Sequence, residues 1–255
     1  AKGLAMLCII AGHQGIDTIN RIVFPFHVPI FFLIAGYFLN SQESIGQLSR
    51  KKTRSLLIPY AFTAVLAALL ETLRQFYVSG WDTKVLLPTL DTALLSGFYG
   101  SATYDNIMPP RVQPVMGPIW FLWALFWALL LVRMLLDRKN GPWILLGTAG
   151  LSYLTSRRFW LPFNLQAGGT GALYVFVGAF FRRQGKTLRF QPLLFLLGVA
   201  VWILEYRQGI RVSIASNRYD MLAVSFLGSI LISYVVFCLS QGLERLFRIP
   251  VFRQV

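Results

Sequence analysis

Two histidines, His13 and His27, lie in neighbouring apolar segments near the start of the chain, and the sequence contains no others. His13 closes a run that begins at Lys2, and His27 opens the run over residues 26–37. Imidazole is the side chain most readily tuned to move protons near neutral pH, and an ionisable group in an apolar segment is costly unless it has a function. The pair therefore predicts a site of proton-transfer chemistry.

The spacing from Lys2 to His13 also has a chemical meaning. Eleven residues at about 100° and about 1.5 Å per residue return to nearly the same helix face, roughly 16 Å further along. This arrangement suits a donor whose phosphates are held at the membrane surface while its reactive end reaches inward, as in coenzyme A. Equally, Lys2 is explained as a flanking charge and His13 as a hydrogen-bonded interfacial histidine, and periodicity alone leaves both interpretations open.

The elements that position these residues are membrane helices. The chain has 255 residues, of which 56% are hydrophobic and 13% charged, a composition too apolar for a soluble domain of this length. We predict an all-α, polytopic transmembrane bundle that forms one domain over residues 1–255. Apolar runs predict about eight spans, at roughly 3–15, 22–39, 55–78, 118–136, 142–156, 167–181, 190–206 and 221–240.

Basic residues fall in alternate connections between these runs, which predicts that those connections and both termini are cytoplasmic. The net charge of +14 is thus explained by topology and contact with membrane lipids, and nucleic acid is not an expected partner. Cys8 and Cys238 lie inside apolar runs, so we expect free thiols. The basic residues concerned are Arg50, Lys51, Lys52, Arg54, Arg133, Arg138, Lys139, Arg182, Arg183, Lys186, Arg189, Arg245, Arg248 and Arg253.

The opposite face carries the longest connection, at about residues 80–117, which contains Trp81, Asp82, Asp91, Tyr104 and Asp105 among turn-forming residues. Such a loop suits either sugar binding or a solvated lid. The short fifth and sixth spans, around Pro162 and the glycines at 168, 169 and 171, predict broken helices that line a cavity. Five arginines on this side depart from the charge rule and fit either recognition of an acidic or phosphorylated glycan or headgroup contact; these are Arg157, Arg158, Arg207, Arg211 and Arg218.

Three further residues in the apolar runs are candidates for substrate binding. Glu71 and Arg74 are three residues apart on one helix face, so they form either a structural ion pair or part of an acceptor site. Trp120 begins the fourth span, where tryptophan is ordinarily an interface anchor. The chain has no nucleophile elbow or phosphate-binding loop, and two histidines with few nearby carboxylates predict no metal site. A reaction at such a site is therefore expected to be a direct transfer between two bound substrates in preference to a metal mechanism, and a transient covalent intermediate on histidine or serine stays an alternative.

Four motifs in order carry a resemblance to a known family. They are Lys-Gly, an apolar run and Gly-His at 2–13; Phe-His-Val-Pro-Ile-Phe-Phe-Leu-Ile-Ala-Gly-Tyr-Phe at 26–38; the basic-to-Pro-Tyr passage at 51–60; and Gly-Pro-Ile-Trp-Phe-Leu at 117–122. The chain thereby resembles the membrane-bound acyltransferase 3 family, in particular its fucose O-acetylase-like branch. The resemblance is specific in the first 60 residues and weakens after about residue 165.

The resemblance implies a bundle of about ten transmembrane helices in the bacterial inner membrane. It also implies transfer of an acyl group, usually acetyl, from cytoplasmic acyl-CoA to a hydroxyl of an envelope glycan or lipid-linked sugar. Position by position, it implies that His13 is the general base, that Lys2, Lys52 and Arg54 hold the donor phosphates, and that His27 orients the first imidazole, polarises the thioester or binds acceptor. A structural role for His27 beside Pro29 is an alternative. In the same way, Trp120 would stack on the acceptor.

Two departures from the family pattern matter. Lys2 stands where the commoner motif has Arg, which replaces a bidentate fork by a point charge. An acidic residue expected before Lys2 and two spans expected after Val255 are missing from the sequence, which predicts a fragment of the family's domain. Two other functions are therefore kept: a transporter or flippase of envelope precursors that uses His13, His27 and Glu71 as a proton relay, and an inactive acyltransferase-like scaffold.

Overall fold

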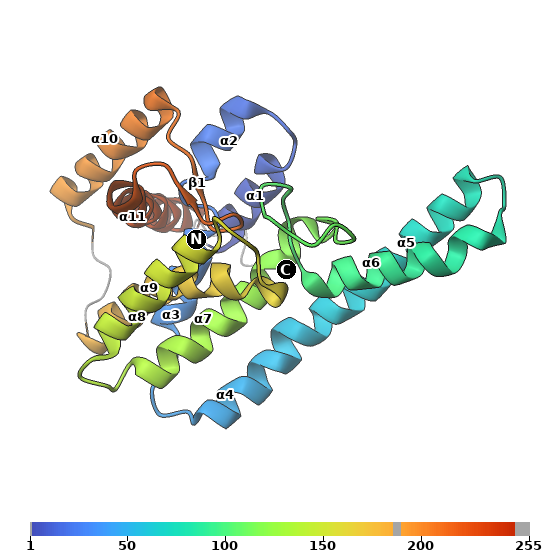
Figure 1. Cartoon of the computed structure of the whole chain (residues 1–255). Coiled ribbons are helices and arrows are strands. Elements are labelled where there is room, and N and C mark those ends of the chain that lie inside the picture. The colour runs from blue at the N-terminus through green and yellow to red at the C-terminus, as the bar shows by residue number, and fades with distance from the viewer. Residues whose placement is uncertain (1, 186–189, 248–255) are drawn as a thin grey trace.

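The structure of the chain is a computed structural model that describes residues 2–185 and 190–247. It is built of helices joined by short turns, with one small hairpin (Figure 1). The α-helices are α1 (Lys2–Gly12), α2 (Asp17–Val23), α3 (Pro29–Tyr37), α4 (Ile45–Lys52), α5 (Ile58–Val78), α6 (Leu86–Tyr99), α7 (Phe121–Leu135), α8 (Gly141–Thr155), α9 (Leu165–Arg183), α10 (Pro192–Gln208) and α11 (Leu222–Phe247). Short helical turns are η1 (Thr53–Leu57), η2 (Thr83–Val85), η3 (Gly117–Trp120) and η4 (Pro162–Asn164).

Three helical stretches in this part of the chain are long and apolar enough to cross a membrane: Ile45–Val78, Gly117–Leu135 and Leu222–Glu244. The helical bundle agrees with the predicted fold class, whereas the prediction of about eight spans stays a prediction. Two predicted spans differ in detail. The third begins at Ile45, because α4, η1 and α5 are continuous. The second is interrupted at residues 24–28, because Pro25 cannot supply the backbone donor that a continuation of α2 requires, and the helix resumes at Pro29.

The predicted long connection at 80–117 contains a helix, α6, which runs beside α5 in an arm that projects from the rest of the molecule (Figure 1). Pro88 lies in the first turn of α6, where a missing N–H leaves no bond unmade. Tyr60 is fully buried and donates a 2.6 Å hydrogen bond to the carbonyl of Gly97. Small residues at Ala64 and Gly97 let the two helices approach closely.

The centre of the bundle is α9, which packs against α3, α7 and α8. The prediction that its glycines break the helix is wrong, since α9 is continuous from Leu165 to Arg183. The glycines make room for neighbouring helices instead. A Cβ on Gly169 would lie 2.1 Å from the Ser152 hydroxyl, and one on Gly171 would lie 2.4 Å from the ring of Phe32.

Two glycines set the closest helix crossing in the molecule's core, that of α3 and α9. A Cβ on Gly36 would lie 1.9 Å from the carbonyl oxygen of Val175, and a Cβ on Gly178 would lie 2.0 Å from the carbonyl oxygen of Leu33. Each helix therefore places its backbone against a glycine of the other. Because α3 directly follows the turn that contains His27, this crossing fixes the position of the second histidine.

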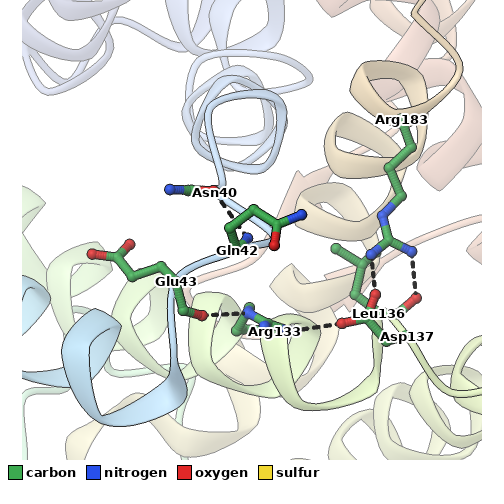
Figure 2. Close-up of polar contacts among 7 residues, drawn as sticks. All are labelled: Asn40, Gln42, Glu43, Arg133, Leu136, Asp137 and Arg183. Carbon is green, nitrogen blue, oxygen red and sulfur yellow. Dashed lines mark hydrogen bonds and ion pairs between the residues drawn. The ribbon is translucent and has the colours of Figure 1, made fainter.

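One end of the bundle is held by arginines that bind neighbouring backbone (Figure 2). Arg133 donates a 2.8 Å hydrogen bond to the carbonyl of Glu43 and forms a 2.8 Å ion pair with Asp137. Arg183 binds the same carboxylate and donates a 2.9 Å hydrogen bond to the carbonyl of Leu136. These contacts join the ends of α7 and α9 to the turn before α4. Arg133 and Arg183, two of the basic residues from which the topology was predicted, thus also hold neighbouring segments together.

This end of the bundle should respond to acid. Hydrogen bonds from Arg183 and then Arg133 lower the pKa of Asp137 below its ordinary value of 3.8. A lowered folded-state pKa means that the carboxylate stabilises the protein above pH 3.8 and that this contribution is lost as the pH falls through the lowered value. Asp137→Asn should therefore reduce stability near neutral pH. Screening of a side chain that is 56% exposed limits the loss to about 1 kcal/mol or less.

The measurement is thermal unfolding of both proteins in detergent over a pH series. The two curves should begin to converge below pH 3.8 and should meet once the pH has fallen through the lowered pKa of Asp137. A difference that persists unchanged in acid would assign the effect of the substitution to something other than the charge.

Candidate active site

A cavity of about 290 Å³ lies where the turns after α1 and α2 meet η3 and a small antiparallel hairpin. The hairpin consists of β1 (Val212–Ser213) and β2 (Arg218–Tyr219), with Val212 opposite Tyr219. Both histidines line the cavity. In Figure 1, α1, α2 and β1 gather at the upper centre of the view, away from α4 at the lower edge. The two residues that the sequence singles out for proton chemistry therefore share one site.

His13 is the first residue beyond α1, and its side chain is held by the helix that it ends. Its Nδ1 lies 2.7 Å from the carbonyl oxygen of Ile9, one turn earlier. Gly12 permits this turn to pack tightly, because a Cβ there would lie 2.9 Å from Val23. The ring of His13 is exposed at the cavity, so it can reach a bound substrate.

His27 repeats this arrangement in the turn between α2 and α3. Its Nδ1 lies 3.0 Å from the carbonyl oxygen of Val23, again four residues earlier. Its ring is 7% exposed and packs on Phe24 with ring centroids 4.8 Å apart. His27 is therefore held more rigidly than His13 and has less freedom to move during a reaction.

The two backbone contacts decide which ring nitrogen is available. A carbonyl oxygen only accepts hydrogen bonds, so Nδ1 must carry the hydrogen in both rings. A neutral imidazole with its hydrogen on Nδ1 has an unprotonated Nε2. In its neutral form each histidine therefore has its acceptor nitrogen at Nε2, which is the form that a general base requires.

Trp120 forms another wall of the cavity, together with Pro118 and Phe121. It is the last residue of η3 and is 5% exposed, so it belongs to the buried wall of the site and differs from the exposed membrane-interface anchor that tryptophan ordinarily forms. The carbonyl of Trp120 accepts a 3.2 Å hydrogen bond from the amide of Asn164, which also donates 2.6 Å to the carbonyl of Gly100. Asn164 in turn accepts a 3.2 Å bond from the indole of Trp160.

Asn164 therefore holds this wall from behind, and its removal should be costly. Asn164→Asp replaces the side-chain NH₂ group by an oxygen, which then faces the two carbonyl oxygens that the amide served. The residue is only 1% exposed, so water cannot take the place of the lost donor. We expect a loss of about 2–4 kcal/mol in unfolding free energy, because buried acceptors are left unsatisfied. Denaturant or thermal unfolding measures it, with Asn140→Asp as the exposed control. Equal stability of the two variants would contradict the bonding role.

The hairpin and the loop at 102–105 complete the cavity with residues that sequence patterns did not bring together. Asp105, Arg211, Ser216 and Arg218 all line it. The sequence placed the two arginines and Asp105 on one side of the membrane without placing them beside the histidines. The alternation of polar and apolar residues at 211–214 is the period-two signal of a strand that could have predicted the hairpin.

Glu71 and Arg74 lie elsewhere. They form the ion pair that their spacing predicts, with Arg74 Nη2 at 2.7 Å from Glu71 Oε1. Both line a groove of about 900 Å³ between α5 and α6, and neither lines the histidine cavity. The three residues predicted to form the proton relay of a transporter, His13, His27 and Glu71, therefore do not lie in one cavity.

Two of the predicted donor-binding cations, Lys52 and Arg54, also lie outside the cavity. Lys52 ends α4 and Arg54 lies in the π-helical turn η1, where its side chain is exposed. Lys2 begins α1, and its side chain lies outside the part of the chain that the structure describes. Along the helix, Lys2 is about 10 Å from Ile9 and about 16 Å from His13, the two residues near the end of α1 that line the cavity.

An apolar groove of about 460 Å³ runs between α3, α9 and α11, from Tyr37 and Gln241 to Ile30. Its last residue on α3, Ile30, is adjacent in sequence to Pro29, which lines the histidine cavity. The groove thus extends along α3 toward the histidine cavity.

Helices of membrane length define a membrane protein, and the cavity lined by two imidazoles is the candidate site of its chemistry. The acyltransferase domain of the acyltransferase 3 family matches residues 1–251, and the chain belongs to this family. It is also similar to nodulation protein NolL of Mesorhizobium japonicum, with 26% identity over 165 residues. That match covers 58% of this chain and 38% of the length of NolL. No solved structure gives a significant match to the chain.

Proposed function

We propose that the protein is an integral membrane O-acyltransferase that moves an acyl group from acyl-CoA to a sugar hydroxyl, with acetyl as the preferred acyl group. The acceptor is an envelope polysaccharide, a glycolipid or a related lipid-linked sugar. The observation that carries this proposal is the shared cavity, in which Nδ1 of each imidazole contacts a backbone carbonyl and Nε2 is left for a substrate. Membership of an acyltransferase family supplies the reaction class.

In the proposed reaction, the acceptor hydroxyl donates its hydrogen bond to Nε2 of His13. The hydroxyl oxygen attacks the thioester carbonyl carbon as its proton moves to Nε2, and a new C–O bond forms. When the C–S bond breaks, the electron pair leaves on sulfur, and the His13 imidazolium returns the proton to the thiolate. The products are an O-acyl sugar and free thiol, and His13 ends neutral, ready for another cycle.

The surrounding residues would position the acceptor. A neutral His27 offers only an acceptor nitrogen to the cavity, so it suits a second sugar hydroxyl better than the oxygen of the thioester. Trp120 supplies an aromatic wall suited to the apolar face of a sugar ring. Both are held in place by backbone contacts, which keeps the reacting groups in register.

The donor would enter from the basic end of the bundle. Lys2, Lys52 and Arg54 would hold its phosphates by charge-assisted hydrogen bonds. The thioester would reach the histidines along α1 and α3, a distance of roughly 16 Å over the length of α1. In this proposal the basic end and both termini face the cytoplasm of a bacterial inner membrane.

The test uses the purified full-length protein in detergent with [¹⁴C]acetyl-CoA and a mixed envelope glycan fraction. Label should enter the glycan with the wild-type protein, and the Gly46→Ala variant is a control because a Cβ there meets no neighbour. If a folded preparation showed no donor binding and no label transfer, the acyltransferase proposal would be refuted and the transporter or scaffold interpretation favoured.

A further inference from the structure

The hairpin wall of the histidine cavity carries a cation that the protein itself does not pair. Arg211 lines the cavity, and its guanidinium forms no hydrogen bond or ion pair within the described residues. Its backbone N–H donates a 2.9 Å hydrogen bond to Oδ2 of Asp220, which fixes the start of the hairpin. The guanidinium is exposed at the cavity and is therefore available to a ligand.

The second arginine of this wall, Arg218, is paired with a carboxylate. Arg218 donates from Nε to Oδ1 of Asp220 at 2.9 Å, and Asp105 also attracts it. The hydrogen bond to Asp220 raises the pKa of Arg218. Asp220 thus accepts a side-chain hydrogen bond from Arg218. It meets Arg211 through the backbone N–H and by charge attraction alone, so the guanidinium of Arg211 keeps its hydrogen-bond donors for a ligand.

A hydroxyl group beside these arginines is also unsatisfied. Ser216 lines the cavity, and its Oγ is buried without a hydrogen-bond partner in the described part of the chain. Buried polar groups are normally hydrogen-bonded, so an orphan at a cavity wall indicates a missing partner. The wall itself is firm, since Val212 and Ile214 are 2% and 3% exposed and anchor the hairpin in the core.

We propose that this wall binds the acceptor through a negatively charged group, a carboxylate or a phosphate carried by the sugar. Arg211 is the specificity-determining residue, and Ser216 binds a neighbouring hydroxyl. A guanidinium matches the two oxygens of either anion in a bidentate way. The proposal rests on the proposed function, because it names the chemical class of the acceptor for that same cavity.

The test measures binding without turnover. The full-length protein in nanodiscs of phosphatidylcholine is titrated with a trimer of galacturonic acid and a trimer of galactose, and then with galactose 6-phosphate and galactose. We expect the charged member of at least one pair to bind about tenfold more tightly, as for a charge-assisted hydrogen bond. Arg211→Gln should abolish this preference.

Arg207→Gln is the matched control, because Arg207 is an exposed arginine in the last turn of α10 that does not line the cavity. It should keep the preference, which excludes a general effect of surface charge. Thermal unfolding of both variants checks that they fold.

Three results would overturn the proposal. One is equal binding of the charged and neutral members in both pairs. The second is an Arg211→Gln variant that loses acetyl-CoA binding and retains the sugar preference, which would assign Arg211 to the donor. The third is loss of sugar binding when phosphatidylglycerol is added to the discs, which would assign the site to a lipid headgroup. A preparation that prefers the charged sugar but transfers no label would contradict the proposed function and leave the anion site intact.

Discussion

Replacing His13 by alanine is expected to lower the rate of acyl transfer by about 10²–10⁴-fold, the usual contribution of a general base. The variant keeps α1, because His13 follows the last helical residue and its ring is exposed. What it loses is the unprotonated Nε2 that takes the proton of the acceptor hydroxyl. The measurement is initial rate of label transfer from [¹⁴C]acetyl-CoA at saturating donor, with binding of acetyl-CoA followed separately.

The neighbouring residue provides a control for this experiment. Gln14 makes the same kind of contact as His13, a 3.2 Å hydrogen bond from its side chain to the carbonyl of Ile10 four residues earlier. Gln14→Ala therefore removes a comparable backbone contact without removing a base, and its rate should stay within about threefold of wild type. Near-normal transfer by His13→Ala would remove His13 from the mechanism even if transfer itself is confirmed.

The second large effect is structural and concerns the crossing of α3 and α9. Gly36→Ala is expected to destabilise the protein by about 3 kcal/mol or more, at the upper end of the cost of overpacking. Its Cβ would lie 1.9 Å from a backbone oxygen of Val175, which cannot move without moving α9. Any separation of the helices also displaces the turn at His27, so transfer activity should fall with stability.

Thermal unfolding in detergent and the yield of folded protein measure this effect. Gly147→Ala is the control, since Gly147 lies inside α8 and a Cβ there meets nothing within 4 Å. Alanine is preferred over glycine in a helix by up to about 1 kcal/mol, so the control should be neutral or slightly stabilising. Equal unfolding temperatures for Gly36→Ala and wild type would show that the two helices can separate without cost.

Most of the helical segments were predictable from hydropathy alone. Runs of apolar residues between basic clusters led to segments close to α7, α8, α9 and α11, because a helix in an apolar surrounding must satisfy its backbone within itself. The helix in the arm, α6, was missed because Pro88 and Gly97 were interpreted as loop residues. The glycines of α9 were misinterpreted as breaks because sequence does not show that Ser152 and Phe32 press against them.

The residues of the site likewise fall into those that the sequence identified and those that only the structure brought together. The rarity of histidine in apolar segments was enough to identify His13 and His27 as candidates, and the motifs around them were enough to indicate the acyltransferase 3 family, which the match over residues 1–251 confirms. These conclusions depend on residue type and local spacing, which are properties of the chain itself.

Only the tertiary structure showed which residues share a cavity. It placed Arg211 and Ser216 beside the histidines and placed Glu71 in a separate groove. Such contacts join positions far apart along the chain, as when Asn106 binds the carbonyl of Ala215 at 3.0 Å across 109 residues. Hydropathy shows that a helix side is buried but not which partner buries it, because many partners satisfy the same apolar surface. That choice is made by packing, through close approaches such as Gly36 against Val175.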